Sequence, residues 1–197
     1  MSCDSVLARA TAAAAASPDA AAPHTMGRVL ADLLTYPSDQ FDARLREAVE
    51  SVRRALPAAA EPLAAFAAAT IHLSCAEREE LYTRTFDINP ECSLEIGWQL
   101  FGEEYHRGAL LVRLRSELRR CGIAESTELP DHLTHVLALL DRLPPAEARS
   151  FAHCCVIPAV DKMLLALAER GNPYGDLLLA AGLFLKHRFV DPAPGGD

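Results

Sequence analysis

The sequence predicts an all-α protein, a single-domain bundle of about eight helices. From Met26 onward, apolar residues recur at spacings of three and four, the period of a helix that buries one face. No segment shows the sustained period-two alternation of β-branched residues that indicates a strand. A length of 197 residues, of which 50% are hydrophobic, suits one core better than two.

In the first half of the helical region, helices are expected over residues 26–35, 38–56, 61–72 and 74–85. Pro37 ends the first helix, because the residue before a proline disfavours the α conformation. Ser38 is expected to cap the second helix, and Pro62 suits the first turn of the third. Ser74 and Glu77 form a capping-box pattern that opens the fourth.

In the second half, helices are expected over residues 93–120, 130–142, 145–170 and 173–188. Gly102 is a candidate bend in the first of these, and Gly122 is its C-terminal cap. Pro130 is expected to start the next helix, and Pro158 to kink the one after it. Asn172 and the following proline cap the last helix, whose final turn carries cations that suit the helix dipole.

The two ends of the chain are expected to lie outside the helical domain, which spans residues 26–190. Residues 1–25 form an Ala-rich segment of the composition expected for a disordered tail, and residues 191–197 a flexible C-terminal tail. The apolar run from Leu177 to Leu185 is about half the length needed to cross a bilayer. We therefore expect a cytoplasmic protein without direct membrane insertion.

The net charge limits the class of partner. A formal net charge of -8 disfavours nucleic acid, whose phosphates need clustered Lys and Arg, and favours a basic partner. Six cysteines without a CxxC pair give no zinc-ribbon or thioredoxin-like motif, and reduced thiols are expected.

Two clusters could carry chemistry. Asp131, His132 and His135 share one helical turn, a spacing at which histidines can ligate a metal, although the sequence names no further ligands. The run from His153 to Cys155 could place a thiolate beside a histidine, but apolar neighbours favour buried, inert thiols. No Walker A, GxGxxG or GxSxG sequence is present. A small helical metal- or thiol-dependent enzyme stays open as the alternative function.

An aromatic stripe could belong to the core or to a binding groove. Trp98, Phe101 and Tyr105 recur at helical spacing, and carboxylates precede, interrupt and follow them. Apolar side chains with an acidic rim would accept a basic, amphipathic peptide helix. The carboxylates that suggest such a rim are Glu91, Glu95, Glu103, Glu104, Glu125, Glu128 and Asp131.

Three short segments resemble the NarJ branch of the TorD/DmsD/NarJ family of chaperones for molybdoenzymes. They are YTRTFD at residues 82–87, GEEYHRG at residues 102–108 and ELPDHL at residues 128–133. The similarity in helical order covers about residues 26–190, while the specific motifs lie within residues 82–133. The stretch at residues 94–101 looks closer to chaperones of dimethylsulfide, ethylbenzene, chlorate or selenate oxidoreductases than to those of nitrate reductase.

The resemblance implies a non-catalytic, all-helical protein with no metal or cofactor of its own. Its partner would be the apo form of a molybdenum bis-guanine-dinucleotide oxidoreductase, bound at the N-terminal or leader segment of the catalytic subunit. Binding would keep that subunit competent for cofactor insertion and, where relevant, proofread Tat export; the chaperone could be a monomer or a dimer. We expect Asp131 and its neighbours to be exposed contacts. The matching positions, expected to bind the client peptide, are Tyr82, Phe86, Asp87, Trp98, Phe101, Tyr105, Arg107, Pro130, Asp131 and His132.

Overall fold

A computed structural model describes residues 25–168 and 171–190, and this part of the chain contains helices and no strand. The prediction of an all-α fold is confirmed. The tails expected at residues 1–25 and 191–197 lie outside the described residues, apart from Thr25, whose side chain caps the first described helix, α2 (Met26–Leu33).

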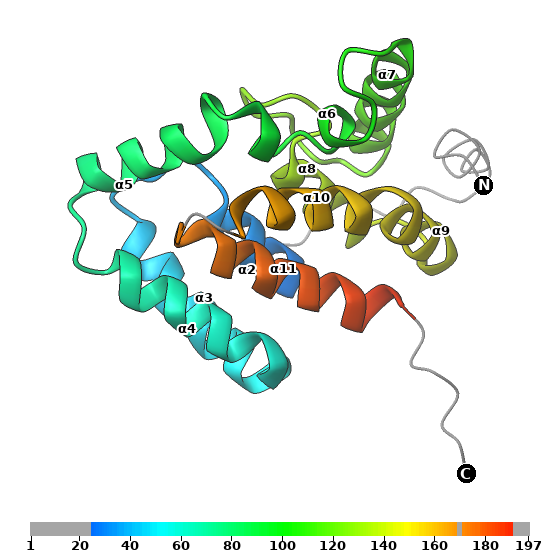
Figure 1. Ribbon diagram of the computed structural model, residues 1–197. Coiled ribbons are helices and arrows are strands. Elements are labelled where there is room, and N and C mark those ends of the chain that lie inside the picture. Colours follow the sequence, from blue (N-terminus) through cyan, green and yellow to red (C-terminus); the bar gives the residue numbers. More distant parts are fainter. Residues whose placement is uncertain (1–24, 169–170, 191–197) are drawn as a thin grey trace.

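The centre of the fold is α11 (Tyr174–Phe189), which packs between α10 (Ile157–Leu167) and α4 (Ala60–Thr70) (Figure 1). It is buried on several sides, as expected of a helix that is apolar around most of its circumference. Its last turn carries the predicted cations Lys186, His187 and Arg188. The N–H of Tyr174 donates to the side chain of Asn172 (3.0 Å), which confirms the predicted cap.

The N-terminal helices pack beside this centre. The helix α2 contacts both α3 (Phe41–Ala55) and α8 (Leu133–Leu140), and the 3-10 turn η1 (Pro57–Ala59) connects α3 to α4. The predicted cap at Ser38 is wrong, because α3 begins after Gln40 and has no side-chain cap. The capping box of Ser74 and Glu77 at the start of α5 (Cys75–Tyr82) is confirmed.

The predicted continuous helix over residues 93–120 is wrong. It consists of α6 (Ile96–Phe101) and α7 (Tyr105–Arg120), separated at Gly102, whose φ of 57° and ψ of -130° are outside the helical range. After α7, the N–H of Gly122 donates to the carbonyl of Arg119 (3.1 Å) and that of Ile123 to Leu118 (2.9 Å). This pair of bonds is the glycine cap expected at Gly122.

The predicted start of a helix at Pro130 is also wrong, since α8 begins at Leu133 with His132 as its N-cap. One long helix with a kink at Pro158 was expected over residues 145–170. The structure has three consecutive elements there, α9 (Pro145–Phe151), the π-helical η4 (Ala152–Val156) and α10. Pro158 stands in the first turn of α10, where a missing N–H is tolerated. This stretch, Pro145–Leu167, passes a length and hydropathy test for membrane spans, but half of its most apolar window is buried, as in a core helix.

Candidate functional site

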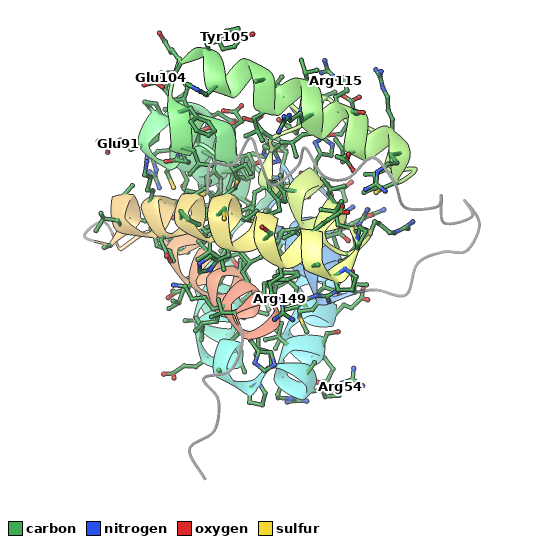
Figure 2. The ribbon with its side chains drawn as sticks, turned by 90° about the vertical axis from the view of Figure 1, so that its right-hand side faces the viewer. Arg54, Glu91, Glu104, Tyr105, Arg115 and Arg149 are labelled. Carbon is green, nitrogen blue, oxygen red and sulfur yellow. The ribbon has the colours of Figure 1, made fainter. Side chains whose placement is uncertain are left out.

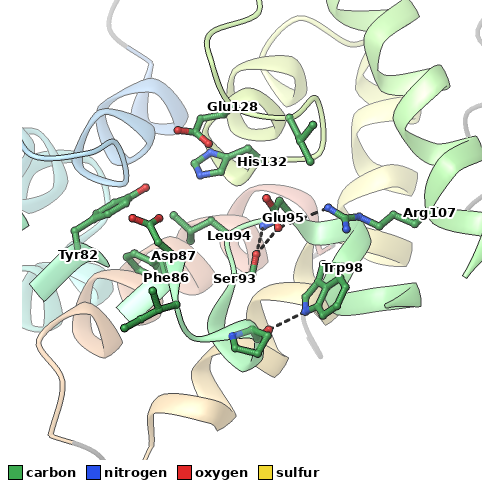
Figure 3. A pocket seen from close by; sticks show the side chains of 13 residues that line it. Tyr82, Phe86, Asp87, Ser93, Leu94, Glu95, Trp98, Arg107, Glu128 and His132 are labelled. Atoms are coloured by element: carbon green, nitrogen blue, oxygen red, sulfur yellow. Dashed lines mark hydrogen bonds and ion pairs between the residues drawn. The ribbon is translucent and has the colours of Figure 1, made fainter. Parts of the chain in front are cut away.

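A cavity of about 490 Å³ lies where α5, α6, α7 and the segment before α8 meet (Figure 3). It combines apolar and aromatic side chains with carboxylates. Its lining residues are Tyr82, Phe86, Asp87, Ile88, Pro90, Ser93, Leu94, Glu95, Trp98, Arg107, Glu128, Leu129 and His132.

The aromatic wall comes from the end of α5 and the π-helical η2 (Thr83–Asp87) that follows it. The rings of Tyr82 and Phe86 pack edge to face at 5.1 Å, and both contact the ring of the buried Tyr174. The hydroxyl of Tyr82 donates to the carbonyl of Leu34 (3.1 Å), and burial is the main reason that its pKa is raised. This wall is therefore rigid and stays neutral, and η2 ends with Asp87 exposed at the cavity.

A short antiparallel bridge between the segment before α6 and the segment before α8 forms the base of the cavity. The N–H of Ile96 donates to the carbonyl of Asp131 (2.9 Å), and the N–H of Leu133 donates to that of Leu94 (2.8 Å). These two bonds place Glu95 opposite His132, although the residues are far apart in the sequence. Residues 129–132 form a turn, in which the N–H of His132 donates to the carbonyl of Leu129 (3.0 Å), and His132 itself is extended. The helix α8 therefore begins after this turn and not at Pro130.

Arg107, near the start of α7, joins two carboxylates and an aromatic ring. Its Nε lies 3.3 Å from Oδ2 of Asp131, its Nη2 lies 3.6 Å from Oε2 of Glu95, and its guanidinium lies over the ring of Trp98 at 5.5 Å. Asp131 is fully buried, and this burial raises its pKa while Arg107 opposes the rise. Gly97 permits the approach, since a Cβ there would lie 2.6 Å from Oδ2 of Asp131.

Trp98 separates the cavity from a second hollow. Its Nε1 donates to the carbonyl of Pro90 (2.8 Å), which holds the indole ring in place (Figure 3). The second hollow has a volume of about 460 Å³ and shares Pro90 and Trp98 with the first. Its other lining residues are Glu91, Gln99, Lys162, Leu165 and Ala166.

The cavity has an excess of negative charge. Three carboxylates line it, those of Asp87, Glu95 and Glu128, and Arg107 is the cation among its lining residues. Burial, followed by repulsion from Asp87 and Glu95, raises the pKa of Glu128. Since Arg107 also pairs with the buried Asp131, the carboxylates of the cavity lack a matching number of cations.

The two histidines of the predicted metal cluster have structural partners. Nδ1 of His132 accepts from the N–H of Thr134 (3.4 Å) and lies 2.7 Å from the hydroxyl of the same residue, which makes His132 the cap of α8. Burial, and secondarily the proximity of His135, lowers the pKa of His132 to about 4. Nε2 of His135 accepts from the N–H of Ser126 (3.1 Å), and its Nδ1 donates to the carbonyl of Leu129 (2.9 Å). Within residues 25–168 and 171–190, no group of three or more His, Cys, Asp or Glu side chains could hold a metal ion.

The thiols of Cys75 and Cys121 have raised pKa values, so they ionise less readily than usual, and burial is the main cause in Cys121. Cys75, Cys92, Cys121 and Cys154 are reduced thiols, as expected. Cys155, which is buried, departs from the expectation of reduced thiols, because it is disulfide-bonded.

The structure brings six of the ten predicted site residues into the cavity wall, namely Tyr82, Phe86, Asp87, Trp98, Arg107 and His132. Pro130 and Asp131 are buried and lie outside the lining, so the expectation that Asp131 is an exposed contact is wrong. Phe101 and Tyr105 also lie outside the lining, and Tyr105 is 88% exposed at the outer end of α7 (Figure 2). The break at Gly102 separates the predicted stripe, so its members do not share one face.

Sequence reasoning predicted the loop carboxylates Glu95 and Glu128 near the site but missed the apolar lining residues that come from loops. Ile88 and Leu129 are apolar and exposed beside the cavity, and Leu94 is buried in its wall. An exposed isoleucine in a loop that otherwise has turn residues indicates a binding surface. A search for periodic apolar residues does not detect it.

Comparison with known proteins gives one family. No curated protein matches the chain. A family profile described as nitrate reductase delta subunit matches residues 38–178, which include all the lining residues of the cavity and most of the described helices. The match covers well over half of the sequence and agrees with the resemblance of the three motifs. The chain therefore belongs to the nitrate reductase delta subunit family, whose members are assembly chaperones of molybdoenzymes.

Proposed function

We propose that the cavity beside Trp98 binds the N-terminal or leader segment of a molybdoenzyme catalytic subunit in the cytoplasm. The bound apoenzyme would be held open for insertion of its molybdenum cofactor and, where the enzyme is exported, kept from the Tat machinery until it is loaded. The observation that carries this proposal is the combination of an aromatic wall with unmatched carboxylates in one cavity.

The two kinds of side chain have different tasks. The rings of Tyr82 and Phe86 and the indole of Trp98 offer apolar surface that is held in place before the peptide arrives, which lowers the entropy lost on binding. The carboxylates of Asp87 and Glu128 attract a basic segment and favour it over neutral ones. A peptide that carries cations among apolar residues matches both.

The alternative of a metal- or thiol-dependent enzyme gains no observation in its favour. The ring nitrogens of His135 bind backbone groups, and His132 uses Nδ1 to cap α8. The family to which the chain belongs consists of chaperones.

Calorimetric titration tests the proposal. Synthetic peptides that cover the first 30 or so residues of candidate molybdoenzyme catalytic subunits are titrated into the full chain. Replacing Glu128 by Gln should lower the affinity for the tightest-binding peptide by about tenfold, since a charge-assisted contact contributes roughly 1.5–3 kcal/mol to binding. Glu103→Gln is the matched control, because Glu103 is exposed and lies outside the cavity. If no such peptide binds, or if both variants lose affinity equally, the proposal is wrong.

A further inference from the structure

Arg107 makes two ionic contacts at the cavity, one with a buried carboxylate and one with a partly exposed carboxylate. Its Nε faces Oδ2 of the fully buried Asp131 at 3.3 Å, and its Nη2 faces Oε2 of the partly exposed Glu95 at 3.6 Å. Charge-assisted bonds between guanidinium and carboxylate groups normally measure about 2.7–2.9 Å. Both contacts are longer, and Oδ1 of Asp131 has no hydrogen-bond partner among the described residues.

The two carboxylates hold the guanidinium for different reasons. Asp131 has lost its hydration, so the loss of Arg107 would leave a buried charge without a partner. Glu95 is 29% exposed, accepts a hydrogen bond from the hydroxyl of Ser93, and lies in the wall of the cavity. Its carboxylate therefore keeps a partner and some contact with water if Nη2 moves away. Ion pairs of this partly exposed kind contribute only about 0–1 kcal/mol to stability.

We infer that Arg107 is an internal substitute for the client's cation, and that it sets which peptides the cavity accepts. This inference rests on the proposed function and specifies its chemistry. In the empty cavity, Nη2 of Arg107 partly neutralises Glu95. A guanidinium or ammonium group of the client takes its place at Glu95, while Nε of Arg107 stays on Asp131. A purely apolar peptide cannot take this place, because it would leave Glu95 and its neighbouring carboxylates facing apolar groups.

The indole of Trp98 reports this exchange. Trp98 is the single tryptophan of the sequence, and the guanidinium of Arg107 lies over its ring at 5.5 Å. Movement of Arg107 away from Glu95, or the arrival of another cation at Glu95, alters the charge next to the indole. The fluorescence of Trp98 therefore changes on binding whether or not Arg107 is present. The chain thus needs no added label.

The test uses ethylguanidinium chloride as the probe and Trp98 fluorescence as the readout, on the full chain. The double variant Arg107→Gln with Asp131→Asn removes both charges together, so that no buried carboxylate is left without its cation. With the competitor gone from Glu95, the variant should bind ethylguanidinium about fivefold more tightly than the unaltered chain. Adding Glu95→Gln to the double variant should remove the gain.

The matched control is the double variant Arg115→Gln with Glu125→Gln, which also removes one cation and one carboxylate. Arg115 lies further along α7, pairs with Glu125 at 2.8 Å and stands outside the cavity (Figure 2). The same loss of charge there should leave the affinity for ethylguanidinium unchanged.

Equal or weaker binding by the double variant overturns the inference, as does the absence of binding to both proteins. A gain of similar size in the Arg115 and Glu125 control also overturns it, because such a gain does not depend on Glu95. If client peptides still bind the unaltered chain in the calorimetric titration, the proposed function survives the failure of this inference.

Discussion

At the scale of single residues, Gly97 is a position where the site has no room for a larger side chain. A Cβ at this position would lie 2.6 Å from Oδ2 of Asp131 and 3.2 Å from the side chains of Arg107 and Leu110. The buried carboxylate cannot move away without losing its ion pair. The ion pair between Asp131 and Arg107 therefore requires a glycine at this position in the first turn of α6.

Gly97→Ala should lower the free energy of unfolding by roughly 1–3 kcal/mol, the usual cost of overpacking. Gly108→Ala is the matched control, because no atom lies within 4 Å of the place that its methyl group would take and alanine favours a helix. It should raise the free energy of unfolding by about 0.5–1 kcal/mol. Urea denaturation measures both, and changes of the same sign in the two variants would contradict this account.

His132 makes stability depend on pH. Its pKa falls from 6.5 in an exposed histidine to about 4 in the folded protein, mainly through burial. As the pH falls below 6.5, the unfolded chain takes up the proton first, so stability that is present above pH 6.5 is lost between pH 6.5 and 4. The loss is roughly 3 kcal/mol, from about 1.4 kcal/mol per pKa unit.

Denaturation at several pH values tests this contribution. His132→Asn keeps a side chain that can cap α8 but does not titrate, so its stability should fall less between pH 6.5 and 4 than that of the unaltered chain. His106→Asn is the control, because the side chain of His106 is 57% exposed. An identical pH profile for all three proteins would show that His132 does not carry the effect.

At the scale of elements, Gly102 decides how α6 and α7 meet. Its φ of 57° with ψ of -130° is a conformation that side chains with a Cβ rarely adopt. Gly102→Ala should therefore cost about 1–3 kcal/mol of stability although no atom lies within 4 Å of the added methyl group. Thermal unfolding measures this loss. Unchanged stability would mean that the connection between the two helices is not held in this conformation.

Local signals predicted the helices, and non-local contacts caused the errors. The capping box at Ser74 and the glycine cap at Gly122 depend on neighbouring residues, so the sequence was sufficient for both. The apolar period continues through Gly102, so the sequence predicts a bend at this glycine rather than the end of a helix. The start of α8 was missed because the carbonyl of Asp131 accepts from the N–H of Ile96, a partner that no local pattern reveals.

The site was predictable to the extent that its residues belong to short motifs. The segments around Tyr82 and His132 supplied cavity residues, while Tyr105 was assigned on the assumption of an unbroken helix. Burial of Asp131 was not predictable, because a carboxylate after Pro130 usually lies at an exposed helix start. Only the position of Arg107 from another helix makes that burial tolerable.

At the scale of the whole molecule, the net charge of -8 and the carboxylates of the cavity act in the same direction. A cationic client peptide should be attracted over a distance set by the Debye length, about 10 Å at 0.1 M salt. Its affinity, measured by calorimetry, should fall as sodium chloride rises from 0.05 to about 0.5 M. An affinity that is constant across this range would mean that apolar contacts alone determine binding.

The central claim is that the cavity beside Trp98 recognises positive charge within an apolar client segment. Its most direct test is a titration of the full chain, followed by Trp98 fluorescence, with a client N-terminal peptide and with the same peptide in which citrulline replaces each arginine. Citrulline keeps the shape of the side chain and removes its charge. We predict a saturable fluorescence change with the arginine peptide and an affinity at least about tenfold lower with the citrulline peptide. Equal affinities for the two peptides would contradict the claim.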